Sequence, residues 1–207
     1  SFTPLSEGHF SATLSFTSND GDENPYEISL EGDCSEHIVL LVPDEYATIQ
    51  TALDSAWSGD TVAEAAGTYT EDLVFPSTNV VLRGAADGGT IIEGSGSSSV
   101  ITFDNGQDES TMLVSLTVTG GVASDGGGIH VNGANPTLLR VVLSGNTASQ
   151  GGAIYCYNSS LLLQSVTAEG NTAYTSGGAL YLDLSGPVVN NSIFWNNTGG
   201  EIGVGSG

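Results

Sequence analysis

A repeat of about 25 residues in the last third of the chain limits the possible folds more than any other feature. Each copy begins with a glycine, followed by a small residue and a short apolar run. The three copies start at Gly127-Gly128-Ile129, Gly152-Ala153-Ile154 and Gly178-Ala179-Leu180. A second mark, formed by Asn146, Asn171 and Asn197, keeps the same spacing of 25 and then 26 residues. Self-similarity at a fixed period of this size indicates an architecture of stacked repeats.

The apolar runs within each repeat are short, rich in β-branched and aromatic residues, and separated by Gly, Asn and Ser. Such runs predict strands joined by turns instead of helices. A coil of a parallel β-helix fits this pattern, because every coil pairs with the coils above and below it. Equivalent residues then lie about 4.8 Å apart, so Asn146, Asn171 and Asn197 are expected to stack at a turn and to bond along the stack. The alternative is that they are three unrelated residues in Gly-rich loops.

The segment before the repeats has strand patterns on either side of a stretch with helical spacing. Ile49, Ala52 and Leu53 keep that spacing ahead of Gly59, which predicts a short helix covering the open end of the core. The block consists of Val42-Pro43, Thr48-Ile49-Gln50, Gly59-Asp60-Thr61-Val62 and Gly67-Thr68-Tyr69. It closely resembles the start of right-handed parallel β-helix proteins of the pectin-lyase-like superfamily.

With the downstream repeats, this resemblance covers about residues 38–204, and it extends to non-catalytic bacterial surface members of the superfamily. It implies an all-β fold in which residues 36–207 form a right-handed parallel β-helix of roughly seven coils. Fold alone does not assign a function, because one fold carries many activities.

Residues 1–35 alternate between apolar and polar side chains and predict an N-terminal β-hairpin. Its segments Phe2-Thr3-Pro4, Gly8 to Leu14, Ser18-Asn19-Asp20 and Leu30-Glu31-Gly32 resemble the closing strands of hydin-type immunoglobulin-like domains. The earlier strands of such a domain are absent, and a lone hairpin is marginally stable in water. Either the chain is a fragment of a longer protein, or another element completes the hairpin. That element would be the solenoid itself or a neighbouring molecule, the latter by strand addition.

The charge of the chain excludes several classes of partner. The formal net charge is −22, with 24 acidic side chains against two basic ones, Arg83 and Arg140. Nucleic acid and anionic membrane surfaces are expected to repel such a chain, and it contains no apolar run long enough to enter a membrane. No charged leader precedes Ser1, which suggests that a signal peptide or a longer upstream region has been removed. These features predict a secreted or cell-surface protein.

An acidic chain also offers weak sites for calcium, the one cofactor that the sequence suggests. Asp20, Asp22 and Glu23 form an acid-rich turn without the spacing of a complete EF-hand loop. The resemblance implies that a lyase of this superfamily would use a basic residue beside a calcium site. A hydrolase of this superfamily would use several Asp residues on adjacent coils. Neither Arg83 nor Arg140 has a carboxylate cluster beside it in the sequence, and no carboxylate pair recurs between the repeats. We therefore predict a protein without catalytic residues.

Two further sets of residues each allow two interpretations. Tyr155, Tyr181 and Trp195 recur near the repeats and could form a platform for sugar rings, whereas Tyr155 and Tyr181 could equally form a structural ladder. Cys34 and Cys156 should lie about 20 Å apart along the axis, too far for a disulfide within one chain. They are either unpaired thiols, with Cys156 filling the core, or partners in a bond between subunits.

The C-terminal residues complete the functional prediction. Ile202 and Val204 begin a further coil with no capping helix after them, so this end offers a template for strand pairing. A head-to-tail contact between this end and the hairpin would generate a filament. The self-assembly candidates are Phe10, Leu14, Phe16, Ile28, Leu30, Ile202 and Val204. The leading hypothesis is thus an extracellular structural protein that assembles with itself; the alternatives are a polysaccharide-binding or polysaccharide-degrading module and a domain of a large adhesin.

Overall fold

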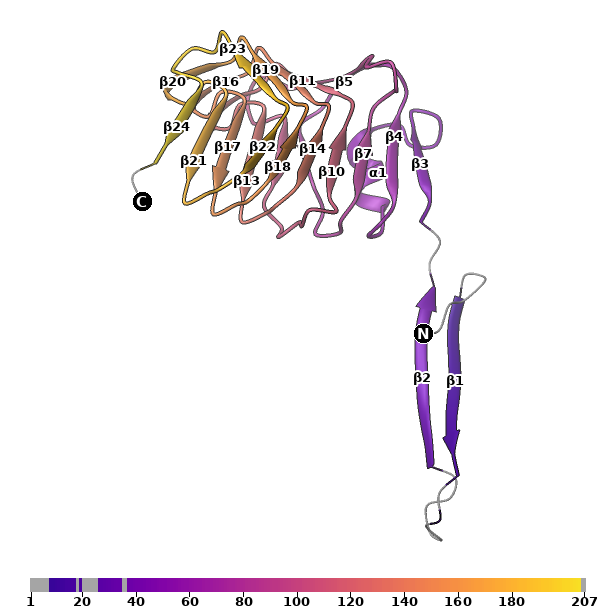
Figure 1. Cartoon of the computed structure of the whole chain (residues 1–207). Coiled ribbons are helices and arrows are strands. Elements are labelled where there is room, and N and C mark those ends of the chain that lie inside the picture. The colour runs from indigo at the N-terminus through magenta and orange to yellow at the C-terminus, as the bar shows by residue number, and fades with distance from the viewer. Residues whose placement is uncertain (1–7, 18, 20–25, 35–36, 206–207) are drawn as a thin grey trace. The chain divides into compact units, whose positions relative to one another are not determined.

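The computed structural model describes residues 8–17, 19, 26–34 and 37–205. The chain divides into two compact units, Ser1–Ile38 and Val39–Gly207. Figure 1 shows the hairpin of the first unit and the stacked coils of the second.

The first unit contains an antiparallel hairpin of β1 (Gly8–Phe16) and β2 (Tyr26–Cys34). Leu14 lies opposite Ile28 in this hairpin, and Phe16 lies opposite Tyr26. Residues that face each other across two strands point to the same side of the sheet. Leu14, Phe16, Ile28 and Leu30 therefore share one face, and each is between 39% and 48% exposed. Taken by itself, the hairpin thus has one face made of apolar side chains.

The second unit is a parallel β-solenoid of about seven turns, which confirms the predicted fold class. Its first sheet has the order β22 (Val188–Asn190), β18 (Leu162–Gln164), β14 (Thr137–Leu139), β10 (Met112–Val114), β7 (Val81–Arg83), β4 (Thr61–Glu64) and β3 (Val39–Val42). The second has the order β23 (Ile193–Trp195), β19 (Thr167–Glu169), β15 (Val142–Ser144), β11 (Thr117–Thr119), β8 (Thr90–Glu93) and β5 (Gly67–Thr70).

Two further sheets complete the coils. The third sheet has the order β24 (Ile202–Val204), β21 (Leu180–Asp183), β17 (Ile154–Tyr157), β13 (Ile129–Asn132), β9 (Ile101–Phe103) and β6 (Leu73–Val74). The fourth consists of β12 (Val122–Asp125), β16 (Thr147–Gln150) and β20 (Thr172–Ser176). Neighbouring strands pair in parallel, and Ile129, Ile154 and Leu180 occupy one register position, as the repeat predicted.

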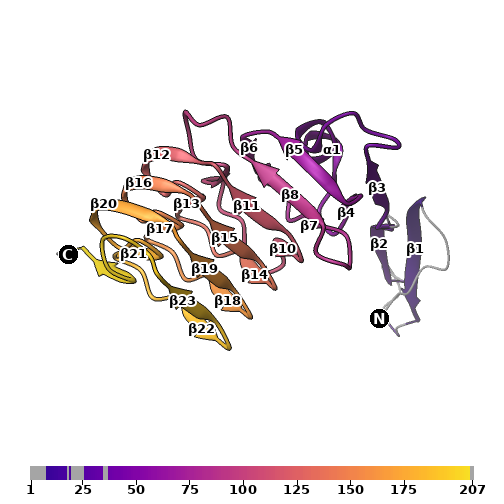
Figure 2. The same cartoon turned by 90° about the horizontal axis from the view of Figure 1, so that it is seen from above.

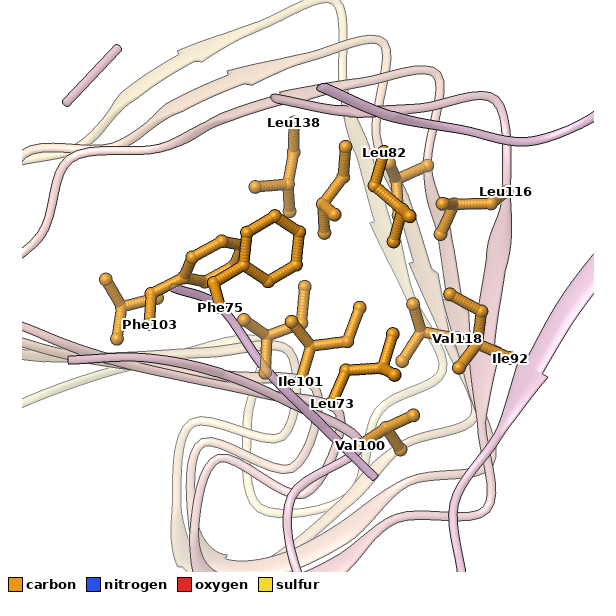
Figure 3. Close-up of a cluster of buried hydrophobic side chains, with 14 of the residues drawn as sticks. Leu73, Phe75, Leu82, Ile92, Val100, Ile101, Phe103, Leu116, Val118 and Leu138 are labelled. Atoms are coloured by element: carbon orange, nitrogen blue, oxygen red, sulfur yellow. The ribbon is translucent and has the colours of Figure 1, made fainter. Parts of the chain in front are cut away.

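The core is built from columns of side chains that point inward from successive coils. Leu82, Leu113, Leu138 and Leu163 form one such column, and each is fully buried. The column is regular because residues in register lie one strand spacing apart, about 4.8 Å. Figure 3 shows how the inward side chains of several strands fill the interior of the solenoid.

A stack of asparagines lines one turn of the solenoid, as the repeat predicted. The side chain of Asn171 accepts hydrogen bonds from the backbone N–H and the Nδ2 of Asn146, at 3.1 and 3.0 Å. Its own Nδ2 donates to the carbonyl oxygen of Leu143 at 2.9 Å and to Oδ1 of Asn197 at 2.9 Å. Asn146 and Asn171 are fully buried, so this stack supplies the partners that buried amides require.

One end of the solenoid is covered by the helix α1 (Ile49–Ser55), which confirms the predicted capping helix. Thr48 caps its N-terminus by accepting a hydrogen bond from the backbone N–H of Thr51, and the helix buries Ile49, Ala52 and Leu53. The carboxamide of Gln50 accepts from the backbone N–H of Val74 at 2.9 Å and donates to its carbonyl oxygen at 3.0 Å. This side chain occupies the edge of β6 and blocks strand pairing there.

Close approach of neighbouring coils requires glycine at the start of each repeat. A Cβ atom on Gly152 would lie 2.6 Å from the carbonyl oxygens of Gly178 and Thr172. Both obstacles are backbone atoms, so Gly152→Ala is expected to destabilise the solenoid by about 1–3 kcal/mol through overpacking. Gly186→Ala is the matched control, since a Cβ there would meet no atom within 4 Å. Urea unfolding of the two variants checks this prediction, and equal midpoints would contradict it.

Candidate functional site

Three aromatic residues of the third sheet form a stack. His130, Tyr155 and Tyr181 lie in register on β13, β17 and β21. Their ring centroids are 5.4 and 5.6 Å apart, and the rings are within 10° and 6° of parallel. Each ring face is therefore directed at the next ring, and Tyr181 is only 8% exposed.

The stacking of Tyr155 on Tyr181 is the arrangement that the ladder interpretation predicts. A sugar platform that includes these two tyrosines stays a prediction. Trp195 lies on β23 of the second sheet and is 70% exposed. It is thus placed on a different sheet from the two tyrosines. The structure does not bring the three proposed sugar-binding residues together.

The buried thiol of Cys156 argues against a bond between subunits. Cys156 is fully buried in the core, and burial raises the pKa of its thiol well above the ordinary value. Because this sulfur lies inside the coil, its burial favours the interpretation of an unpaired thiol, and the bond between subunits through Cys34 stays an untested alternative. Cys156 is the small apolar core residue of the alternative interpretation.

The last described coil exposes side chains that point into the core on the preceding coils. Val189 is 42% exposed, whereas its register partner Leu163 is fully buried. Ile202 is 54% exposed and pairs with Leu180, which is 1% exposed. Val204, another self-assembly candidate, is 72% exposed. Figure 2 shows β22 and β23 at the end of the solenoid opposite α1, and Figure 1 labels β24 beside the C-terminal end of the chain.

The predicted calcium ligands Asp20, Asp22 and Glu23 lie outside the described residues. Within residues 8–17, 26–34 and 37–205, no group of three or more His, Cys, Asp or Glu side chains is arranged to hold a metal ion. Among the described helices, none is long and apolar enough to cross a membrane.

A groove on the first sheet and the turn beside it is a site that sequence reasoning missed. It has a volume of about 470 Å³ and is lined by Ala63, Glu64, Arg83, Gly84, Ala85, Ala86, Val114, Ser115 and Arg140. The two basic side chains of the chain therefore meet at one place, although 57 positions separate them. Nε of Arg140 donates to Oγ of Ser115 at 3.1 Å. The repeat did not indicate that the two arginines lie close together. Equivalent residues of β7 and β10 are 31 positions apart, which departs from the 25-residue period.

Glu64 is the unusual acid of this groove. It is only 4% exposed, and neither carboxyl oxygen has a hydrogen-bond partner among the described residues. Burial raises the pKa of Glu64 from 4.5 to about 8, and the positive charge of Arg83 opposes this shift only in part. One carboxyl group therefore lines the same groove as Arg83, and at neutral pH it is mostly uncharged.

Comparison with known proteins finds one short similarity. Residues 140–157 match the Chlamydia polymorphic membrane protein repeat. This segment begins at Arg140 and contains β15, β16 and β17, so it corresponds to most of one coil and is a β-helix-type repeat. No curated protein matches the chain, and no solved structure matches it.

Proposed function

We propose that this chain is a structural β-solenoid module of a cell-surface protein, which associates head to tail with copies of itself. The proposal rests on the exposure of two apolar side chains of the last described coil. Ile202 is 54% exposed, whereas Leu180, its equivalent one coil earlier, is almost fully buried. Val204 is 72% exposed, whereas Cys156, its equivalent two coils earlier, is fully buried. Burying such side chains is favourable by about 25 cal/mol per Å² of apolar area.

The N-terminal end of the solenoid is a poor partner for the last coil of another copy. Direct stacking of this last coil on the first coil of another copy is blocked, because α1 covers the first coil and Gln50 occupies the edge of β6. Taken by itself, the hairpin has an apolar face, and among the described strands β1 and β2 pair only with each other. We therefore assign the hairpin as the element that pairs with the last coil of the next copy.

Surface location is supported by two similarities. One is the match of residues 140–157 to a repeat of a polymorphic membrane protein. The other is the resemblance to non-catalytic surface members of the pectin-lyase-like superfamily, together with the hydin-type pattern of the hairpin. A net charge of −22 suits a protein in open solvent, and it makes assembly stronger as salt concentration rises.

Blocking one partner at a time tests the proposal. Leu14→Lys places a charge on the apolar face of the hairpin, and Ile202→Lys places one on the last coil. Each variant alone is expected to be monomeric by light scattering. Mixed together they should form dimers, because one retains a free coil and the other a free hairpin.

The control is Thr13→Lys, on the opposite and polar face of β1, which should leave association unchanged. If Leu14→Lys alone still forms dimers, the contact joins two last coils symmetrically. In that case the head-to-tail arrangement is refuted.

A further inference from the structure

We propose that Arg83 and Arg140 form a binding site for an oxyanion, such as a phosphate, sulfate or carboxylate group, in the groove of the first sheet. This inference is independent of self-association. It rests on the position of the two residues, on the absence of competing partners, and on the hydrogen bond that orients one of them.

The solenoid register brings the two arginines to the same side. Arg83 ends β7 and pairs with Val114 of β10, which in turn pairs with Leu139, the residue before Arg140. The two residues are thus two coils apart, about 10 Å along the axis. Arg140 donates from Nε to Ser115, which lies on the intervening coil. This bond holds Nε of Arg140 against the coil that lies between Arg140 and Arg83.

Neither guanidinium is neutralised by the protein. Both arginines are exposed, and no carboxylate of the described residues forms an ion pair with either, although the chain has 24 acidic residues. Asp87 lines the continuation of the groove beside Arg140 without pairing with it. Glu64, the nearest buried acid, is mostly protonated at neutral pH and does not compete.

The planar guanidinium presents its N–H groups in a fork that matches an oxyanion. Because the Arg140 bond to Ser115 uses Nε, its terminal nitrogens remain for a ligand. A groove of about 470 Å³ has room for such a group. The two arginines therefore give the groove a local positive charge. This charge attracts a small anion even though the net charge of the protein is negative.

The chain offers an unusually clear experiment. With two arginines and no lysine, a nitrogen-edited NMR spectrum contains two arginine Nε–H signals. The labelled full chain is titrated with sodium phosphate and, separately, with sodium acetate, each at constant ionic strength. The expected result is that both signals move together along one saturable curve. Saturation by phosphate but not acetate identifies a tetrahedral anion, and the reverse identifies a carboxylate.

Two variants supply the matched control. Ser115→Ala removes the bond to Arg140 and should raise the dissociation constant about tenfold, since a hydrogen bond to a charged group is lost. Ser165→Ala is the control. Ser165 lies in the same turn on the coil after Arg140, and its backbone is left-handed like that of Ser115, with φ of 55° against 56°. Its substitution should leave binding unchanged. Shifts that never saturate, that sodium chloride reproduces, or that affect only one arginine would overturn the proposal.

Discussion

Replacing Asn171 with alanine is expected to destabilise the solenoid more than any surface change, by roughly 4 kcal/mol. The substitution removes the acceptor of two hydrogen bonds from Asn146 and the donor of the bond to Leu143. These groups lie inside the turn, where water cannot replace the lost partner, and each unsatisfied buried group costs about 1–3 kcal/mol. A loss of this size lowers the melting temperature of a unit of this length by about 10 °C.

Asn132→Ala is the control for this experiment. Asn132 ends β13 and is exposed, so its substitution should change stability by less than about 0.5 kcal/mol. Thermal unfolding followed by circular dichroism compares the two. If the melting temperature of Asn171→Ala equals that of Asn132→Ala, the asparagine stack is not a stabilising element.

Glu64 is expected to make the solenoid less stable as pH rises. Its pKa is about 8 in the folded chain and 4.5 ordinarily, so the folded state binds a proton more tightly than the unfolded state. The stability that the protonated Glu64 side chain contributes to the folded state is fully present below about pH 4.5 and is lost as pH rises through about 8. A shift of this size corresponds to roughly 5 kcal/mol between the two limits.

The neutral variant Glu64→Gln isolates this effect. It keeps the shape of the side chain and removes the titration, so it should be more stable than the unmodified chain at pH 9 and show a flatter profile between about pH 6 and pH 9. Glu93→Gln, at an exposed position on β8, should follow the unmodified chain. Urea unfolding across this range is the measurement, and parallel profiles for all three proteins would contradict the role given to Glu64.

The repeat could be predicted from the sequence because every coil places its residues in the same environment. Ile129, Ile154 and Leu180 are confirmed as one column, and Asn146, Asn171 and Asn197 as one stack. The periodic signal reports which residues share a position. It does not report how their side chains turn, and for this reason the ring stack of Tyr155 and Tyr181 could not be distinguished from a platform.

The groove was missed for a different reason. Arg83 and Arg140 belong to coils of unequal length, because the step from Leu82 to Leu113 is 31 residues and the next step to Leu138 is 25. Without the register, nothing places these two arginines together. Glu64 did leave a signal: it follows Val62 by two positions, so strand alternation points both side chains inward.

Sedimentation velocity of the unmodified chain across a wide range of concentration and at two salt concentrations tests head-to-tail association most directly. Head-to-tail association predicts a series of species that grows beyond the dimer as concentration rises, and larger species at higher salt because repulsion between acidic chains is screened. A single monomeric species at every concentration and at both salt concentrations would contradict it.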